Sequence, residues 1–100
     1  MAHTVATIKY NTKPGIAVEF LRLIHGENFQ KTVSGYPGFI SYHLVNPDAD
    51  TWCEYILWET KEAAISGAKD FQTAPAKLEL LPYFILTSFN SNLLETTVSF

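Results

Sequence analysis

The sequence predicts an α+β domain with the ferredoxin-like order of elements, β-α-β-β-α-β, and a four-stranded antiparallel sheet. Segments rich in β-branched residues alternate with segments of helical periodicity, and turn residues separate them. The chain has 100 residues, which is the length of one domain. The expected elements are a strand at Thr4–Tyr10, a helix at Ile16–Ser34, strands at Phe39–Val45 and Thr51–Trp58, a helix at Lys61–Phe71 and a strand at Tyr83–Asn90.

The first strand and the first helix are separated by the turn residues Asn11–Gly15. Thr4–Tyr10 is rich in β-branched residues, which favours a strand. Apolar residues then recur at helical spacing over Ile16–Ser34 and share one face. The members of this face are Ala17, Phe20, Leu21 and Ile24. Gly35 is a typical helix stop, so a single helix is expected up to that point.

The second half of the chain begins with a hairpin. Asn46–Asp50 has strong turn chemistry and joins the second strand to the third. Thr60 is a candidate N-cap for the second helix. Pro75 interrupts that helix, and Ala76–Leu81 is expected to form a short further helical turn. The last residues of the tail, Leu93–Phe100, could form a fifth strand.

Several predicted strands are apolar on both faces, as three pairs of adjacent residues show. An antiparallel sheet with both helices on one face and water on the other should alternate more cleanly between apolar and polar residues. A symmetric dimer in which two bare sheets face each other would bury the second face. We therefore expect a homodimer. The pairs are Phe39 and Ile40, Ile56 and Leu57, and Phe84 and Ile85.

The composition disfavours several classes of partner. The formal net charge is −3, and the 7 Lys and Arg residues are scattered, which argues against a nucleic-acid surface. No apolar run approaches the roughly 20 residues of a membrane-spanning helix. The first residues also lack the basic and apolar regions of a signal peptide. We expect a cytoplasmic protein with no nucleic-acid or membrane partner.

The sequence shows no pattern of metal or cofactor ligands. His3, His25 and His43 fall on three different segments, which disfavours a zinc site. No glycine-rich loop indicates a bound nucleotide or flavin. Cys53 is the only cysteine, so an internal disulfide is impossible. The expectation is a protein without a metal or a cofactor.

Four parts of the chain form a recognisable pattern: Lys13–Gly15 before the first helix, Phe20 within it, Pro37–Ser41 at the second strand, and Tyr55–Ala64 across the third strand and second helix. This pattern resembles the antibiotic biosynthesis monooxygenase family, within the dimeric α+β barrel superfamily. The resemblance spans about residues 4–90 of a single domain that occupies residues 1–100, and it leaves 91–100 as a tail, expected as an extra strand at the dimer interface. It is more specific for the fold than for the activity, because the superfamily is functionally broad.

The resemblance implies an activity and also shows departures from it. The best-understood members resemble cofactor-independent oxygenases that oxidise anthrone-type or quinol-type aromatics with O2, and others degrade haem. Trp58 matches a tryptophan that lines the pocket in the polyketide-oxidising branch. That branch has an asparagine at the position of Glu54, a tyrosine near Ala64 and an arginine near Leu78. The haem-degrading branch has a histidine late in the second helical region, and residues 61–82 contain none.

Residues of equal parity on a strand share a face, and one face of the third strand carries the candidate site. The members of this face are Trp52, Glu54, Ile56 and Trp58. The resemblance implies that they point toward the helices. If the hairpin pairs Leu44 with Trp52, Tyr42 lies opposite Glu54 on the same face. The opposite face, with Tyr55, would line the dimer barrel beside Ser41 and His43.

Polar residues of the first helix are expected to complete a cavity. Asn28 falls in the middle of the apolar face, where a polar side chain needs a partner or a space, and His25 lies at its edge. Small residues of the second helix, such as Gly67, either draw the helix close to the sheet or leave a space. Six residues would then surround a site for a flat aromatic ligand. They are Trp52, Trp58, Tyr42, Asn28, His25 and Glu54.

Three functional hypotheses follow. In the first, Glu54 or His25 removes a phenolic proton, Asn28 and Tyr42 hold the substrate oxygens, and Trp52 and Trp58 enclose the ring. In the second, the protein is a non-catalytic dimer that binds a small apolar ligand or serves as a stress-related scaffold. In the third, side chains fill the pocket and the protein is purely structural. Each candidate also has a structural alternative, such as core packing for Trp58, ion pairing for Glu54 or a half-exposed helix position for His25.

Overall fold

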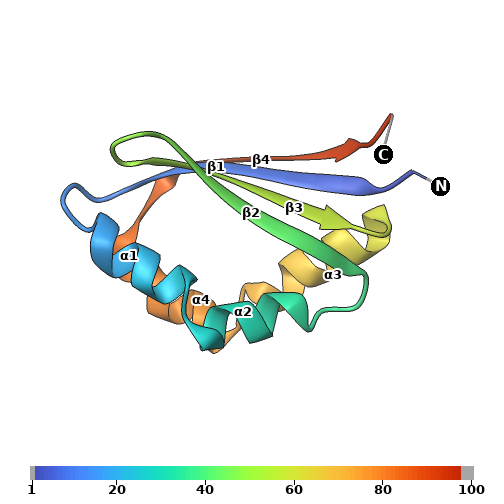
Figure 1. The fold of residues 1–100 in the computed structure, drawn as a ribbon, viewed down its shortest axis with the longest axis horizontal. Coiled ribbons are helices and arrows are strands. Elements are labelled where there is room, and N and C mark those ends of the chain that lie inside the picture. The colour runs from blue at the N-terminus through green and yellow to red at the C-terminus, as the bar shows by residue number, and fades with distance from the viewer. Residues whose placement is uncertain (1, 98–100) are drawn as a thin grey trace.

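The computed structural model describes residues 2–97 and contains one antiparallel sheet with all of the helices on the same side of it (Figure 1). The elements are β1 (Thr4–Thr12), α1 (Ala17–Ile24), α2 (Glu27–Ser34), β2 (Phe39–Asp48), β3 (Thr51–Trp58), α3 (Lys61–Phe71), α4 (Pro75–Leu80), the 3₁₀ turn η1 (Leu81–Tyr83) and β4 (Phe84–Glu95). The strand order is β2-β3-β1-β4, and every neighbouring pair is antiparallel. This topology confirms the predicted ferredoxin-like fold.

The first helical region differs from the prediction, because it is two helices instead of one. The first helix ends at Ile24, and His25 is its C-cap. Gly26 then adopts an extended conformation with φ −67° and ψ 151° before α2 begins. Glycine in a helix interior costs about 0.5–1 kcal/mol relative to alanine, so this position is a weak point of the helix. The break restarts the helical periodicity, and Phe29 and Val33 of α2 become the buried residues in place of Asn28.

The hairpin register also differs from the prediction. Leu44 pairs with Glu54, and Tyr42 pairs with Ile56, so the expected pairing is displaced by two residues. β2 continues as far as Asp48, which pairs with Thr51, and this shortens the expected five-residue loop. An even displacement leaves each side chain on its predicted face. Tyr42 and Glu54 are therefore diagonal neighbours on the helix-facing side of the sheet.

The second helical region follows the prediction closely. α3 begins after Thr60, whose hydroxyl accepts a hydrogen bond of 3.1 Å from the backbone N–H of Ala63. The short α4 begins at Pro75. β4 is longer than expected and continues through residues 91–95, so this part of the tail extends the fourth strand and forms no fifth one. The predicted strand residues 98–100 lie outside the described part of the chain.

The buried core lies between the sheet and the helices. Tyr10, Phe20 and Trp52 pack at one end of it, and Trp58 packs with Ala64 and neighbouring residues at the other. Gly67 of α3 allows the helix to approach the sheet closely, since a Cβ atom at this position would lie 2.3 Å from Cη2 of Trp58. This packing confirms that the Trp52–Trp58 face of β3 looks toward the helices.

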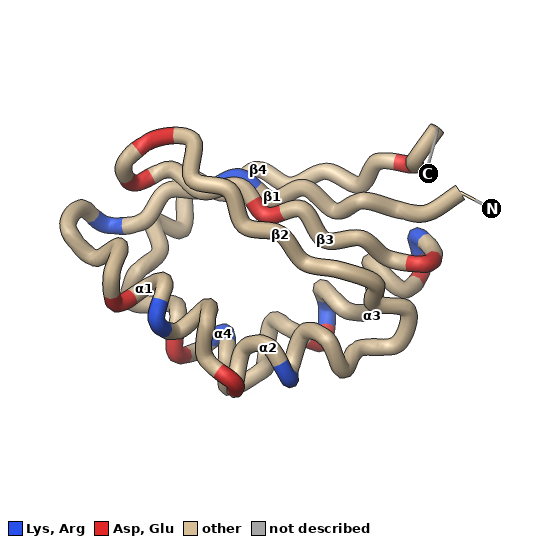
Figure 2. Tube along the Cα trace, in the orientation of Figure 1, with Lys and Arg blue, Asp and Glu red and all other residues tan. Residues whose placement is uncertain are grey.

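The opposite face of the sheet is uncovered and carries large apolar side chains. Tyr55 and Val45 are 41% and 45% exposed, and Leu94 of β4 is 55% exposed. A homodimer through this face stays a prediction, and sedimentation as a monomer at micromolar concentration would contradict it. Lysine and arginine residues lie at separate points of the trace with acidic residues among them (Figure 2).

Candidate active site

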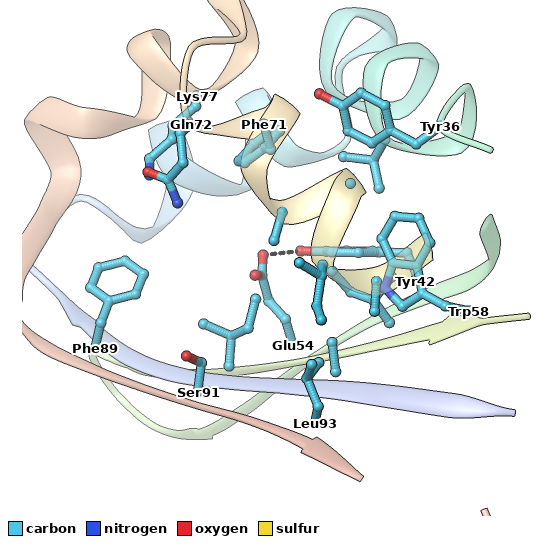
Figure 3. Close-up of a pocket in the computed structure, with 18 of the residues that line it drawn as sticks. Tyr36, Tyr42, Glu54, Trp58, Phe71, Gln72, Lys77, Phe89, Ser91 and Leu93 are labelled. Atoms are coloured by element: carbon cyan, nitrogen blue, oxygen red, sulfur yellow. Dashed lines mark hydrogen bonds between the residues drawn. The ribbon is translucent and has the colours of Figure 1, made fainter. Parts of the chain in front are cut away.

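A cavity of about 400 Å³ lies between the helix-facing side of the sheet and helices α2, α3 and α4. Its floor is formed by alternate residues of β1 and β3 together with residues of β4, and its roof by α3 and α4 (Figure 3). Most of the lining is apolar, and the polar side chains among it include Tyr10, Tyr42, Glu54, Trp58, Gln72, Lys77 and Ser91. The third hypothesis, a pocket filled by its own side chains, requires that no such cavity exists. The structure therefore disfavours it.

Glu54 projects from β3 into the middle of this cavity and is held by two tyrosines. The Tyr42 hydroxyl of β2 donates to its Oε2 atom at 2.5 Å, and the Tyr10 hydroxyl of β1 donates to the same atom at 3.3 Å. β3 lies between β2 and β1 in the sheet, so the two tyrosines reach the carboxylate from opposite sides. Both are diagonal neighbours of Glu54, a separation that long side chains can span.

The environment of Glu54 favours its protonated form. Burial raises the pKa of the Glu54 carboxyl group, while the hydrogen bonds from Tyr42 and Tyr10 lower it by a smaller amount. The side chain is half-buried, and part of its surface lines the cavity. Burial and the charge of Glu54 raise the pKa of both tyrosine hydroxyls, which therefore remain neutral donors. Glu54 therefore exchanges its proton at a higher pH than an ordinary carboxyl group does.

The raised pKa of Glu54 predicts a loss of stability as the pH rises. The folded protein holds this proton to a higher pH than the unfolded chain, so the folded state binds more protons between the two pKa values. The resulting stability is complete below the unfolded pKa of about 4.3 and is lost as the pH passes through the folded pKa. We expect Glu54→Gln, which does not titrate, to gain stability over the wild type as the pH rises.

Urea unfolding at a series of pH values measures this difference, with the exposed Glu62→Gln as the matched control. The difference in free energy of unfolding between Glu54→Gln and the wild type should grow between acidic and neutral pH. Glu62→Gln should show no such trend. A constant difference for Glu54→Gln would show that its carboxyl group has the same pKa in the folded and unfolded states.

Trp58 presents an unpaired donor in the cavity wall. The side chain is only 3% exposed, and among the described residues its Nε1 atom has no hydrogen-bond partner. An indole N–H can only donate, and a buried donor without a partner costs about 1–3 kcal/mol. Phe39 packs edge-on against the ring at 5.9 Å and Gly67 contacts its far end, so the ring is fixed in place. The Nε1 atom is itself buried, so a ligand oxygen would have to displace part of the cavity wall to accept from it.

Lys77 of α4 gives the cavity a cationic side chain. It lies near Gln72, on the opposite side of the cavity from the sheet (Figure 3), and its ammonium group donates to the Gln72 side-chain oxygen. Burial lowers the pKa of Lys77 below that of a free lysine. The cavity therefore combines a carboxyl group on the sheet with an amine near the helices, separated by apolar walls.

The structure brings together three of the six residues that the sequence placed around one cavity. Tyr42, Glu54 and Trp58 line it. Trp52 shares their face but is core: it is 2% exposed and donates to the Thr12 hydroxyl at 2.9 Å. That hydrogen bond and the packing on Phe20, at 4.9 Å between ring centroids, keep Trp52 out of the cavity lining.

His25 and Asn28 also lie apart from the cavity, and this corrects the predicted arrangement. The helix break at Gly26 turns both side chains outward, so both are exposed. Asn28 donates to the carboxylate of Glu79 on the outside of the helix layer. His25 borders a second cavity of about 460 Å³ between α1, α2 and β2. Neither residue is placed to act on a ligand beside Glu54.

Sequence reasoning missed Tyr10, Lys77 and Phe89 as lining residues. Tyr10 could have been found, because it shares its parity with Ala6 and Ile8 on the buried face of β1. Phe89 could not, because its direction depends on an irregularity in β4. Among residues 2–97, no group of three or more His, Cys, Asp or Glu side chains is arranged to hold a metal ion. The described helices are also too short or too polar to cross a membrane.

The family model of the antibiotic biosynthesis monooxygenases matches residues 3–75. The chain belongs to this family. The match covers β1 to the start of α4 and includes Tyr42, Glu54 and Trp58. None of the curated protein sequences compared with the chain matches it.

Solved structures share the whole fold of this family member at low sequence identity. A monooxygenase from the gene ActVA-Orf6 of Streptomyces coelicolor, in complex with Nanaomycin D, is 20% identical with a TM-score of 0.71, covering 99% of this chain and 91% of its own. SnoaB, a cofactor-independent oxygenase from Streptomyces nogalater, is 13% identical with a TM-score of 0.69, covering 99% and 95%. A protein of unknown function from Nitrosomonas europaea is 11% identical with a TM-score of 0.68, covering 99% and 93%. At these identities, the similarity concerns the fold.

Proposed function

We propose that this protein is a cofactor-independent monooxygenase that oxidises a small, electron-rich aromatic of quinol or anthrone type with O2. The observation that carries the proposal is the half-buried Glu54 carboxyl group, whose pKa burial raises, in an apolar cavity that Trp58 also lines. The N–H of Trp58 has no hydrogen-bond partner among the described residues. Membership of the family supports the class of reaction. Two proteins of the same fold also support it, since one is a cofactor-independent oxygenase and the other binds Nanaomycin D.

The reaction needs a base and an electron-rich substrate. The Glu54 carboxylate removes a proton from the substrate and leaves an aromatic anion. This anion gives one electron to O2, and the resulting superoxide combines with the substrate radical to form a C–O bond. The peroxide anion takes the proton back from Glu54. In an anthrone, the hydroperoxide then loses water and leaves a carbonyl group, so that R₂CH₂ and O2 give R₂C=O and H₂O.

The other residues of the cavity position the reacting groups. Trp58 Nε1 would donate to the substrate oxygen on which the negative charge develops, and this satisfies an N–H that is otherwise buried without a partner. Tyr42 and Tyr10 fix the carboxylate by donating to one of its oxygens, which leaves the other oxygen to face the substrate. The apolar walls exclude water and stack against a flat ring.

Oxygen consumption tests the proposal. Wild-type protein, freed of metal by a chelator, is incubated in air with anthrone or 1,4-dihydroxynaphthalene in an oxygen electrode. We expect uptake above the autoxidation rate, and uptake near that rate for Glu54→Ala and Trp58→Ala. Equal uptake by the wild type and both variants across a panel of such substrates would refute the enzymatic function.

A non-catalytic ligand-binding role is the second candidate, and one observation favours it. The positions near which the polyketide-oxidising branch has a tyrosine and an arginine hold Ala64, which lines the cavity, and Leu78, which is 55% exposed outside it. The cavity therefore lacks two polar side chains of that branch. Native mass spectrometry discriminates the two roles, since a binder would retain an apolar ligand and release it chemically unchanged.

A further inference from the structure

β4 does not run regularly along β1. Asn11 of β1 pairs with Ile85 and Lys9 pairs with Asn90, so two steps along β1 correspond to five along β4. The extra residues form a bulge. The Ser88 hydroxyl fixes it by accepting from the Asn11 backbone N–H at 2.8 Å and donating to the Ile85 carbonyl at 2.5 Å.

The bulge decides which side chains of β4 face the cavity. The shift between the two registers is an odd number of residues, and an odd shift reverses the face of every side chain that follows. Phe84, opposite Thr12, faces the helices, so a regular strand would turn Asn90 inward as well. Instead Ser91 lies opposite Ile8 on the helix-facing side. The residues of β4 that line the cavity are Phe84, Phe89, Ser91, Asn92 and Leu93.

Phe89 is the large side chain that the bulge turns inward. Its ring stacks on Tyr10 with 4.7 Å between centroids and meets Phe84 edge-on at 5.1 Å. Tyr10 in turn donates to Glu54, so the position of Phe89 is tied to the carboxyl group. Figure 3 shows Phe89 and Trp58 at opposite ends of the cavity with Glu54 between them. The long axis of a bound ring system therefore runs from Trp58 toward Phe89.

Phe89 is 39% exposed, so the wall it makes is thin. Because the ring lines the cavity and is not enclosed in the core, a smaller side chain would lengthen the cavity instead of leaving a closed void. We propose that Phe89 is the end wall that sets how many fused rings the ligand can have. This inference rests on the proposed function in one respect, namely that the ligand is a flat aromatic.

Equilibrium dialysis under argon tests the inference with 2-naphthol and 2-hydroxyanthracene, which are the same phenol with two and three fused rings. Without O2 the readout is binding alone. We expect Phe89→Ala to raise the affinity for the three-ring phenol, relative to the two-ring phenol, by roughly tenfold. Phe89→Trp should lower the same ratio. Leu86→Ala is the matched control, because Leu86 lies in the same bulge but is 64% exposed and outside the cavity lining.

The outcomes separate this inference from the proposed function. An unchanged ratio in Phe89→Ala and Phe89→Trp, or an equal change in Leu86→Ala, would overturn the role of Phe89 even if the wild type consumes oxygen. If the affinity ratios change as expected but the wild type consumes no oxygen, the role of Phe89 as the end wall is supported and the oxygenase function is refuted. Should Phe89→Ala fail to fold, the fall in the ratio for Phe89→Trp decides the matter. Failure of both phenols to bind any variant would overturn both proposals.

Discussion

Replacement of Glu54 by glutamine is expected to lower kcat/KM for oxidation of the phenol or anthrone by about 10²–10⁴-fold, the usual contribution of a general base. Glutamine keeps the shape of the side chain and can still accept hydrogen bonds from Tyr42 and Tyr10, but it cannot take a proton. Ligand affinity measured without O2 should therefore change little. A variant that retains the wild-type rate would show that the substrate loses its proton by another route.

The pH dependence of the rate distinguishes loss of the base from loss of structure. Glu54 must be ionised to accept a proton, so kcat/KM of the wild type should rise with pH through the raised pKa of Glu54 and then level off. This rise in kcat/KM should occur at a higher pH than the titration of an ordinary carboxyl group, and Glu54→Gln should not show it. Substrates whose own ionisation lies outside the measured range keep the two titrations apart. An identical rise of kcat/KM in the variant would show that the substrate, and not Glu54, is the group that titrates.

Replacement of Trp58 by phenylalanine is expected to weaken ligand binding by roughly tenfold while destabilising the free protein less than the same replacement at Trp52 does. The phenyl ring removes the N–H that has no partner among the described residues, but it is shorter than the indole and loses the contact of the ring's far end with Gly67. Removal of the unpaired donor stabilises the folded protein by about 1–3 kcal/mol. The loss of apolar contact destabilises it and offsets this gain. The ligand then loses one hydrogen bond, which accounts for the lower affinity.

Trp52→Phe is the matched control for this pair of effects. Trp52 Nε1 already donates to Thr12, so its removal leaves the buried Thr12 hydroxyl without that partner and should destabilise the protein. Because Trp52 does not line the cavity, ligand affinity should be preserved. Urea unfolding and anaerobic equilibrium dialysis measure the two quantities. Preserved affinity in Trp58→Phe would mean that its N–H points at no ligand oxygen.

Local sequence rules predicted much of the fold because the relevant signals are short-range. The N-cap at Thr60 and the start of α4 at Pro75 appear where cap and proline rules place them. The side of the sheet on which Tyr42 and Glu54 lie was also correct, although their register was displaced by two residues. Parity along a strand survives an even displacement, so the proximity of these two residues did not depend on the exact pairing.

The remaining features depend on contacts that one sequence does not reveal. A helical pattern continues through Gly26, and only the packing of Phe29 on the sheet shows that the helix must break there. A continuous helix would turn His25 and Asn28 toward the cavity, whereas both side chains are exposed. Phe89 depends on the bulge in β4, which has no distinctive local residue pattern. Each of these misassignments arose where tertiary packing interrupts a regular period.

Incorporation of ¹⁸O2 tests the central claim most directly. Metal-free and flavin-free protein is supplied with anthrone under ¹⁸O2 in ordinary water, and the quinone product is analysed by mass spectrometry. A carboxyl base that allows the substrate anion to reduce O2 predicts product with one ¹⁸O atom, formed by the wild type faster than by Glu54→Gln. Product formed at the same rate by both proteins, or product without ¹⁸O, would contradict an oxygenase reaction at Glu54.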